Sequence, residues 1–158
     1  MPLKILSADI TKLKVDAIVN AANTNLLAGG GVCGAIFRAA GYSELQAACN
    51  KLSPIQTGEA VITPGFSLPA KFIIHTAGPI WRGGNFGEKN LLCACYTNSL
   101  TLATEKNLHS VAFPLISSGI YGYPPRDALT VAVQSIEDFI SKKDLEVILS
   151  VLDKSLLN

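Results

Sequence analysis

The sequence predicts a single α/β domain of three layers, in which helices cover a central sheet. The main observation is that the spacing of apolar residues switches repeatedly between short strand-like runs and helix-like stripes along the 158 residues. The composition is the second observation. With 49% hydrophobic and only 16% charged residues, the chain can form a large core without a disulfide or a metal. We therefore treat residues 1–158 as one domain.

The first half of the chain predicts two strands and two helices. Residues 3–8 and 15–19 are short apolar runs typical of buried strands. Apolar residues then follow at helical spacing over residues 32–40, and Gly41 ends this helix. A second, shorter helix is expected over residues 43–51.

The second half continues the alternation of strands and helices. A turn at Pro64-Gly65 separates two strands, and a loop rich in glycine and proline spans residues 78–87. Pro124 and Pro125 precede a further helix, because proline favours the first helical turn. The elements predicted here are strands over residues 60–63, 72–76, 110–116 and 147–152, and helices over residues 92–103 and 125–140. Unbroken apolarity predicts that the last strand is buried on both faces.

The composition also limits the partners and the compartment. A formal net charge of +1 does not indicate a nucleic-acid partner or an anionic membrane surface. No apolar run approaches the roughly 18 residues that a membrane-spanning helix needs, and the chain reaches Asp9 before a signal-peptide core could form. The four cysteines contain no C-x-x-C pair, so we expect free thiols and no metal. We expect a cytoplasmic monomer with no membrane contact.

The loop after the second strand, residues 20–34, is the first candidate binding site. Three successive glycines lead into a helix, so the backbone can approach a phosphate closely and the unpaired amides of the first helical turn can face it. Asn20 and Asn23 add side-chain amides that can pair with sugar hydroxyls. The alternatives are a flexible connection for the glycines and turn or cap chemistry for the two asparagines.

The second candidate is the segment 117–124, which leaves a strand and enters a helix in the same way. Two such loops at neighbouring strand ends could hold a diphosphate from both sides. Tyr121 could cover the ligand, or it could simply pack beside the turn.

Three further polar residues lie outside these two loops. Asp9 follows the first strand and could accept a hydrogen bond from the exocyclic amine of adenine, or it could cap the turn at Thr11 and Lys12. His75 is the only plausible imidazole base, but its place inside a strand favours a core histidine. His109 lies in a polar loop and carries no functional signal.

Taken together, five segments resemble the macrodomain family, most closely its MacroD-type and bacterial O-acetyl-ADP-ribose deacetylase-like branch. They occur in the same order as in the family, and the match runs from Asp9 to at least Asp153. The segments are Asp9-Ile10-Thr11, DAIVNAAN at 16–23, the glycine run into GAIFRAAG at 34–41, HTAGP at 75–79, and SGIYGYP at 118–124.

This resemblance implies a three-layer α/β/α sandwich with a mixed central sheet and a cleft for ADP-ribose, without a cofactor or a metal. Asp9 would bind the adenine amino group, the amide of Ile10 would meet a ring nitrogen, and Asn23 would meet the distal ribose. The full set of expected ligand contacts is Asp9, Ile10, Asn20, Asn23, Gly30, Gly31, Val32, Cys33, Gly34, Ser117, Ser118, Gly119, Ile120, Tyr121 and Leu152.

The sequence departs from the family pattern in three places. Cys33 stands where hydrolytic MacroD-type members carry the aspartate proposed to position or deprotonate the attacking water. Leu152 stands where many members place an aromatic residue against adenine, so weaker stacking is expected. The chain ends soon after the last strand, where relatives often add a helix, so we expect one face of the sheet to be less well covered.

Three hypotheses for Cys33 follow. The ligand's own phosphate could activate water, Cys33 could act as a thiolate nucleophile, or the domain could bind without cutting. The sequence thus predicts a hydrolase of ADP-ribosyl esters, acting on ADP-ribosylated proteins or on O-acetyl-ADP-ribose, with Asn23 and Cys33 at the reacting end. The alternative is a non-catalytic reader of ADP-ribose or its 1''-phosphate. An unrelated nucleotide-binding domain would show no preference for ADP-ribose over ADP or NAD.

Overall fold

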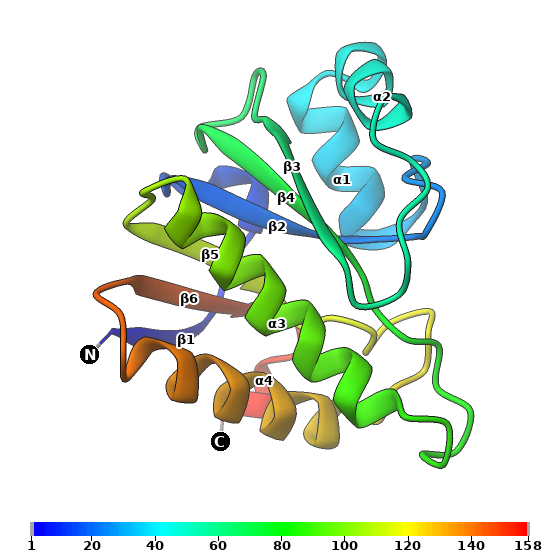
Figure 1. Ribbon diagram of the computed structural model, residues 1–158, viewed down its shortest axis with the longest axis vertical. Coiled ribbons are helices and arrows are strands. Elements are labelled where there is room, and N and C mark those ends of the chain that lie inside the picture. Colours follow the sequence, from blue (N-terminus) through cyan, green and yellow to red (C-terminus); the bar gives the residue numbers. More distant parts are fainter. Residues whose placement is uncertain (1, 158) are drawn as a thin grey trace.

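The computed structural model describes residues 2–157 and forms a three-layer α/β/α sandwich around one mixed six-stranded sheet (Figure 1). The strands are β1 (Leu3–Ser7), β2 (Ala17–Ala22), β3 (Ala60–Pro64), β4 (Phe72–Ala77), β5 (Ser110–Pro114) and β6 (Glu146–Val151). The α-helices are α1 (Gly31–Ala40), α2 (Tyr42–Asn50), α3 (Glu88–Glu105) and α4 (Pro125–Ile140), with short 3-10 helices η1 (Ile10–Lys12) and η2 (Lys154–Leu157). The predicted fold class is confirmed.

The strand order β1-β6-β5-β2-β4-β3 brings distant segments together. All neighbouring strands are parallel except β3, which pairs antiparallel with β4. Strands β2 and β5 are parallel neighbours, with Ala17 opposite Val111 and Ile18 opposite Ala112. Their carboxyl ends therefore lie side by side in the middle of the sheet. The two glycine-rich loops that follow these strands therefore emerge next to each other, as ligand-binding loops of open α/β sheets do.

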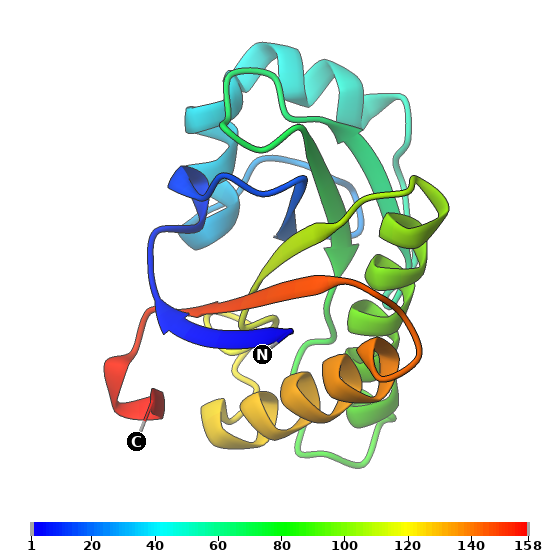
Figure 2. The ribbon, with the colours of Figure 1, turned by 90° about the vertical axis from the view of Figure 1, so that its left-hand side faces the viewer.

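Each face of the sheet has its own hydrophobic core. Helices α3 and α4 pack on one face, where Tyr96, Leu100 and Ala132 meet strand residues such as Phe113. Helices α1 and α2 pack on the other, with Ile36, Phe37 and Leu45 in the second cluster. Figure 2, which views the domain from the side of β1, shows α3 and α4 together on one side and α1 and α2 above. Alternating side chains along each strand supply both cores.

Several predicted boundaries were wrong. The strand predicted over residues 15–19 runs from Ala17 to Ala22, so Asn20 belongs to a strand rather than to a loop. Strand β1 lies within the predicted residues 3–8 and ends at Ser7, but this edge strand is not buried, since Lys4 and Ile5 are exposed. Strand β5 ends at Pro114, two residues earlier than expected. Strand β6 is largely buried as predicted, while Leu152 lies just beyond it.

Helix ends follow the local chemistry of the sequence. Helix α4 begins at Pro125, as expected, and Gly41 ends α1 with a φ of 112°, a backbone conformation that side chains rarely permit. His75 is a fully buried core residue, as predicted, and His109 is exposed. Within residues 2–157, no helix combines the length and apolarity needed to cross a membrane.

Candidate functional site

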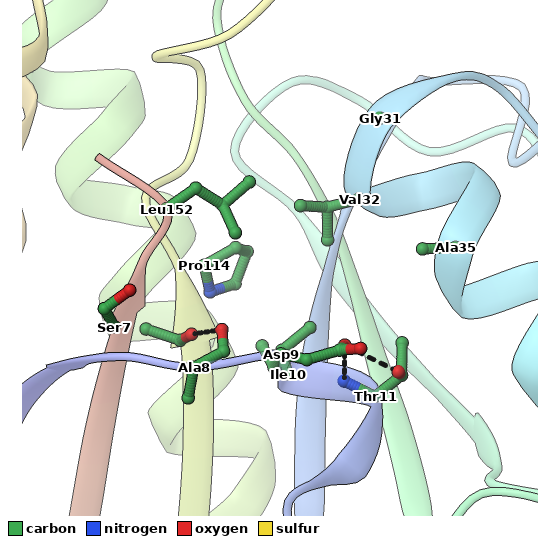
Figure 3. A pocket seen from close by; sticks show the side chains of 11 residues that line it. Ser7, Ala8, Asp9, Ile10, Thr11, Gly31, Val32, Ala35, Pro114 and Leu152 are labelled. Carbon is green, nitrogen blue, oxygen red and sulfur yellow. Dashed lines mark hydrogen bonds between the residues drawn. The ribbon is translucent and has the colours of Figure 1, made fainter. Parts of the chain in front are cut away.

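Two adjoining cavities lie beyond the carboxyl ends of the central strands. The smaller cavity has a volume of about 460 Å³ and the larger about 530 Å³, both within the range of small-molecule sites. The residues that line both are Gly31, Val32, Pro114, Ser150 and Leu152, so the two cavities form one continuous groove. Figure 3 shows the smaller cavity, with the side chains of Val32 and Leu152 above Pro114.

The smaller cavity presents a carboxylate beside an apolar wall. Asp9 and Ile10 lie on one side, and Val32, Ala35 and Leu152 lie on the other (Figure 3). A flat, amine-bearing base would find both apolar cover and a hydrogen-bond acceptor here. Leu152 is 76% exposed, so it covers this wall of the cavity only in part.

Asp9 also caps η1, so both sequence-based hypotheses describe part of its role. Its Oδ1 accepts hydrogen bonds from Thr11 Oγ1 at 2.6 Å and from Thr11 N–H at 3.0 Å. These two bonds, the side-chain one first, lower the pKa of Asp9 below its ordinary value. Because both bonds use Oδ1, Oδ2 is left to accept a hydrogen bond from a ligand.

The larger cavity lies between the two predicted binding loops. Gly29, Gly30, Gly31 and Val32 come from the loop that leads into α1, and residues 117–121 come from the loop after β5. No lysine or arginine among residues 2–157 lines either cavity. An anionic ligand would therefore be held by backbone N–H groups and the N-terminus of α1 rather than by cationic side chains.

Glycine is required for geometric reasons in the first loop. Gly31 has a φ of 57°, which side chains disfavour, at the first residue of α1. A Cβ on Gly34 would lie 2.5 Å from the carbonyl oxygen of Gly29 and would push the loop away from the helix. Gly34 is buried and does not line the cavity, and its close approach to Gly29 gives it a packing role. The ligand contact expected of Gly34 stays a prediction.

The second loop is held in an unusual conformation at its first residue. Ser117 has a φ of 68° although it is not glycine, and only 5% of it is exposed. Its Oγ has no hydrogen-bond partner among residues 2–157. Gly78 permits this arrangement, because a Cβ there would collide with Ser117 Oγ and with the side chain of Ile116. Ser118 turns its hydroxyl back to Leu115 O at 2.9 Å.

Asn23 lines the larger cavity and at the same time organises its own loop. Its Nδ2 donates to Leu27 O at 2.8 Å, and its Oδ1 accepts from Leu27 N–H at 3.0 Å. An amide group carries two N–H donors and two lone pairs, so one of each is left for a ligand. The turn interpretation and the ligand interpretation of Asn23 are thus compatible.

Cys33 lies in the first turn of α1 and lines the larger cavity with 7% of its surface exposed. Its Sγ donates to Leu27 O at 3.8 Å. Burial raises the pKa of the thiol, while hydrogen bonding with the Gly29 backbone and the Asn20 side chain acts in the opposite direction. The group is therefore a neutral thiol near pH 7, which weighs against the thiolate-nucleophile hypothesis.

The structure does not bring Asn20 to the cavity wall. Only 1% of it is exposed, and its Nδ2 lies 3.0 Å from His75 Nδ1, opposite it on the neighbouring strand. His75 Nε2 in turn lies 2.9 Å from Thr63 Oγ1. Asn20 therefore belongs to a buried row of polar side chains with His75 and Thr63, and it does not line the groove.

The predicted contacts other than Asn20 and Gly34 do line the groove. Asp9 and Ile10 line the smaller cavity, Val32, Gly31 and Leu152 line both, and the larger one adds Asn23, Gly30, Cys33, Ser117, Ser118, Gly119, Ile120 and Tyr121. Sequence reasoning missed Gly78, Pro114, Ser150, Asp153 and Leu156, which also line the larger cavity. Only Gly78 and Asp153 had a signal, since Gly78 belongs to the HTAGP segment and Asp153 closes the matched region. Within residues 2–157, no group of His, Cys, Asp and Glu is arranged to hold a metal ion.

A groove with an acceptor for a base at one end and two glycine-rich loops at the other defines a nucleotide-diphosphate-binding α/β domain. Comparison with known proteins identifies the family. The Macro domain family model matches residues 19–132, and the chain belongs to this family.

Three matches illustrate the relationship. O-acetyl-ADP-ribose deacetylase from Salmonella typhimurium is 52% identical over 144 residues, which cover 89% of this chain and 80% of that protein. ADP-ribose glycohydrolase MACROD2 from Xenopus laevis is 56% identical over 135 residues, which cover 85% of this chain and 32% of that protein. The solved structure of an Oceanobacillus iheyensis macrodomain mutant with ADPR has a TM-score of 0.93 and 43% identity, covering 98% of this chain and 87% of that one. These relatives fit the MacroD-type branch expected from the sequence.

Proposed function

We propose that this macrodomain binds ADP-ribose and slowly hydrolyses ADP-ribosyl esters, without a metal and with water activated by the ligand's own phosphate. The observation that carries the proposal is the single groove between the loops 29–33 and 117–121, which continues to Asp9. Adenine would lie between Asp9 and Leu152, the diphosphate between the two loops, and the distal ribose beside Asn23.

The relatives support this assignment of ligand and reaction class. One is named as a deacetylase of O-acetyl-ADP-ribose, another as an ADP-ribose glycohydrolase, and a solved neighbour is described with ADPR. We infer that this chain acts on the same class of ligand, either as a small molecule or attached to a protein. The ester or acetal to be cut would lie at the distal ribose, near Asn23 and Cys33.

Cys33 explains why turnover should be slow. A neutral thiol is a poor acceptor for a proton from water, and burial raises the pKa of Cys33 further from neutrality. Without a side-chain base at this position, we assign the proton of the attacking water to a phosphate oxygen of the bound ligand, which carries negative charge. The competing function is a reader that binds ADP-ribose or its 1''-phosphate without cutting, and the same neutral Cys33 favours it.

Calorimetry with O-acetyl-ADP-ribose separates these functions. An esterase gives sustained heat after each injection until the substrate is exhausted. A reader gives a sharp binding heat that returns to the baseline. A folded protein that gives no heat with either O-acetyl-ADP-ribose or ADP-ribose would refute both functions.

Two variants at one position test how the water is activated. Cys33→Asp introduces a carboxylate, and Cys33→Asn introduces a group of the same shape that is not a base. If the phosphate of the ligand activates water, both variants stay close to the wild-type rate. General base catalysis contributes about a hundredfold to ten-thousandfold. An increase of that size in Cys33→Asp, but not in Cys33→Asn, would contradict phosphate activation and show that the wild type lacks a base at position 33.

A further inference from the structure

The loop that follows β5 has a buried anchor beneath it on α3. Tyr96 is fully buried, and its ring packs against Phe113 with a centroid distance of 5.0 Å. Its hydroxyl accepts a hydrogen bond from Ile116 N–H at 3.1 Å and donates to Pro114 O at 3.4 Å. These two backbone groups flank Leu115, where the chain leaves the sheet. One hydroxyl therefore fixes the direction in which the binding loop starts.

A second residue of α3, Glu88, holds the loop that precedes this helix, residues 82–86. Glu88, the first residue of α3, is buried. Its carboxylate accepts hydrogen bonds from the backbone N–H groups of Arg82 at 2.9 Å, Gly84 at 3.0 Å and Phe86 at 2.7 Å. Desolvation raises the pKa of Glu88, but these N–H groups and its own together lower it to about 2. The carboxylate is therefore ionised at neutral pH and holds the segment 82–86 in place.

Trp81, which directly precedes the segment held by Glu88, contacts the binding loop. The backbone N–H of Trp81 donates a hydrogen bond to the backbone carbonyl of Tyr121 at 2.8 Å, and the Trp81 ring packs on the ring of Tyr123 with a centroid distance of 4.6 Å. Tyr121 lines the larger cavity. The loop 117–121 is thus supported at its start by Tyr96 and near its end by Trp81, and both supports come from α3 or the segment that precedes it.

We propose that Tyr96 and Glu88 are positioning residues for ligand binding, because they set the backbone of the loop 117–121 without touching the ligand. This inference rests on the proposed binding of ADP-ribose. The loop offers backbone N–H groups, whose directions depend on φ and ψ. Among residues 2–157 no lysine or arginine lines the cavity, so no cationic side chain compensates if these N–H groups turn away from the ligand. Ser117 occupies a backbone region that is unfavourable for serine, so the loop needs contacts outside itself to stay in this conformation.

Paired ligands separate positioning from general stability. Adenosine needs only the cavity beside Asp9, whereas ADP-ribose also needs the loop 117–121. We expect Tyr96→Phe, which keeps the ring and loses the hydroxyl, to weaken ADP-ribose binding at least tenfold and to leave adenosine binding within about twofold. Tenfold corresponds to the loss of about one hydrogen bond to a charged group. Glu88→Gln, which keeps the shape of the side chain, should shift the two affinities in the same unequal way.

Matched controls are available on the surface. Tyr42→Phe and Glu105→Gln change exposed residues on α2 and α3, and they should leave both affinities unchanged. The inference is overturned if Tyr96→Phe and Glu88→Gln lower the unfolding temperature but bind ADP-ribose as the wild type does. It is also overturned if adenosine and ADP-ribose weaken equally. A folded wild type that binds adenosine but not ADP-ribose overturns the proposed function itself, and this inference with it.

Discussion

Acidification should destabilise the domain through one buried histidine. His75 is fully buried between Asn20, at 3.0 Å from Nδ1, and Thr63, at 2.9 Å from Nε2, with Cys49 Sγ 3.9 Å from Nε2. None of these three neighbours is an anion that would favour an imidazolium. Burial accordingly lowers the pKa of His75 from 6.5 to about 4.

The size of the effect follows from proton linkage. In the unfolded chain His75 takes up a proton near its ordinary pKa of 6.5, whereas in the folded domain it does so only near 4. The unfolded state therefore binds more protons between these values, and stability falls as the pH falls through 6.5. Between about pH 7.5 and about pH 5, the free energy of unfolding should fall by about 2 kcal/mol.

Urea unfolding at the two pH values, followed through the single tryptophan, Trp81, measures this difference. Carboxylates with lowered pKa values, such as Glu88, lose their contribution mainly below pH 4.5, outside this window. The chain has only two histidines, so the exposed His109 provides the control. His109→Gln should keep the pH dependence and His75→Gln should abolish it. A wild type whose stability is the same at both pH values would refute the argument.

Three further outcomes are expected at the groove. Gly34→Ala should destabilise the domain by about 1–3 kcal/mol and weaken ADP-ribose binding, because the new Cβ meets Gly29 O. Thermal unfolding measures the first effect and calorimetry the second, and unchanged binding would show that Gly34 does not set the position of the loop. Raising NaCl from about 50 mM to about 500 mM should change the ADP-ribose Kd less than about threefold, since no lysine or arginine of the described residues 2–157 lines the cavities and only charged contacts are strongly screened. Leu152→Phe should tighten ADP-ribose by about 0.5–1.5 kcal/mol through stacking on adenine, and an equal gain with ribose 5-phosphate would disprove that cause.

Sequence patterns predicted the glycine-rich loops because local chemistry determines them. A run of glycines before a helix provides a backbone that approaches ligands closely, and Gly30 and Gly31 indeed start α1 at the cavity. The proline pair likewise marked the start of α4. Such features depend on φ, ψ and helix ends, which a few adjacent residues decide.

Pairing between distant strands decided what local patterns could not. Asn20 looked like a loop residue because asparagine and alanine are poor strand formers, but pairing with His75 extends β2 through it and buries its side chain. Strand β1 looked buried because it is apolar, yet it pairs only with β6 at the edge of the sheet. In both cases the neighbouring strand, and not the residue's own propensity, determined burial.

The sequence by itself determined the α/β alternation and the family, and it placed a cysteine, Cys33, shortly after the glycine run. Only the tertiary structure decided that the loops after β2 and β5 share one groove, because this depends on the pairing of strands some 90 residues apart. It also decided that Tyr96 and Glu88 support the second loop, since their partners lie elsewhere in the chain and leave no local pattern. Hydrogen bonds between distant segments depend on packing, which no short stretch of sequence specifies.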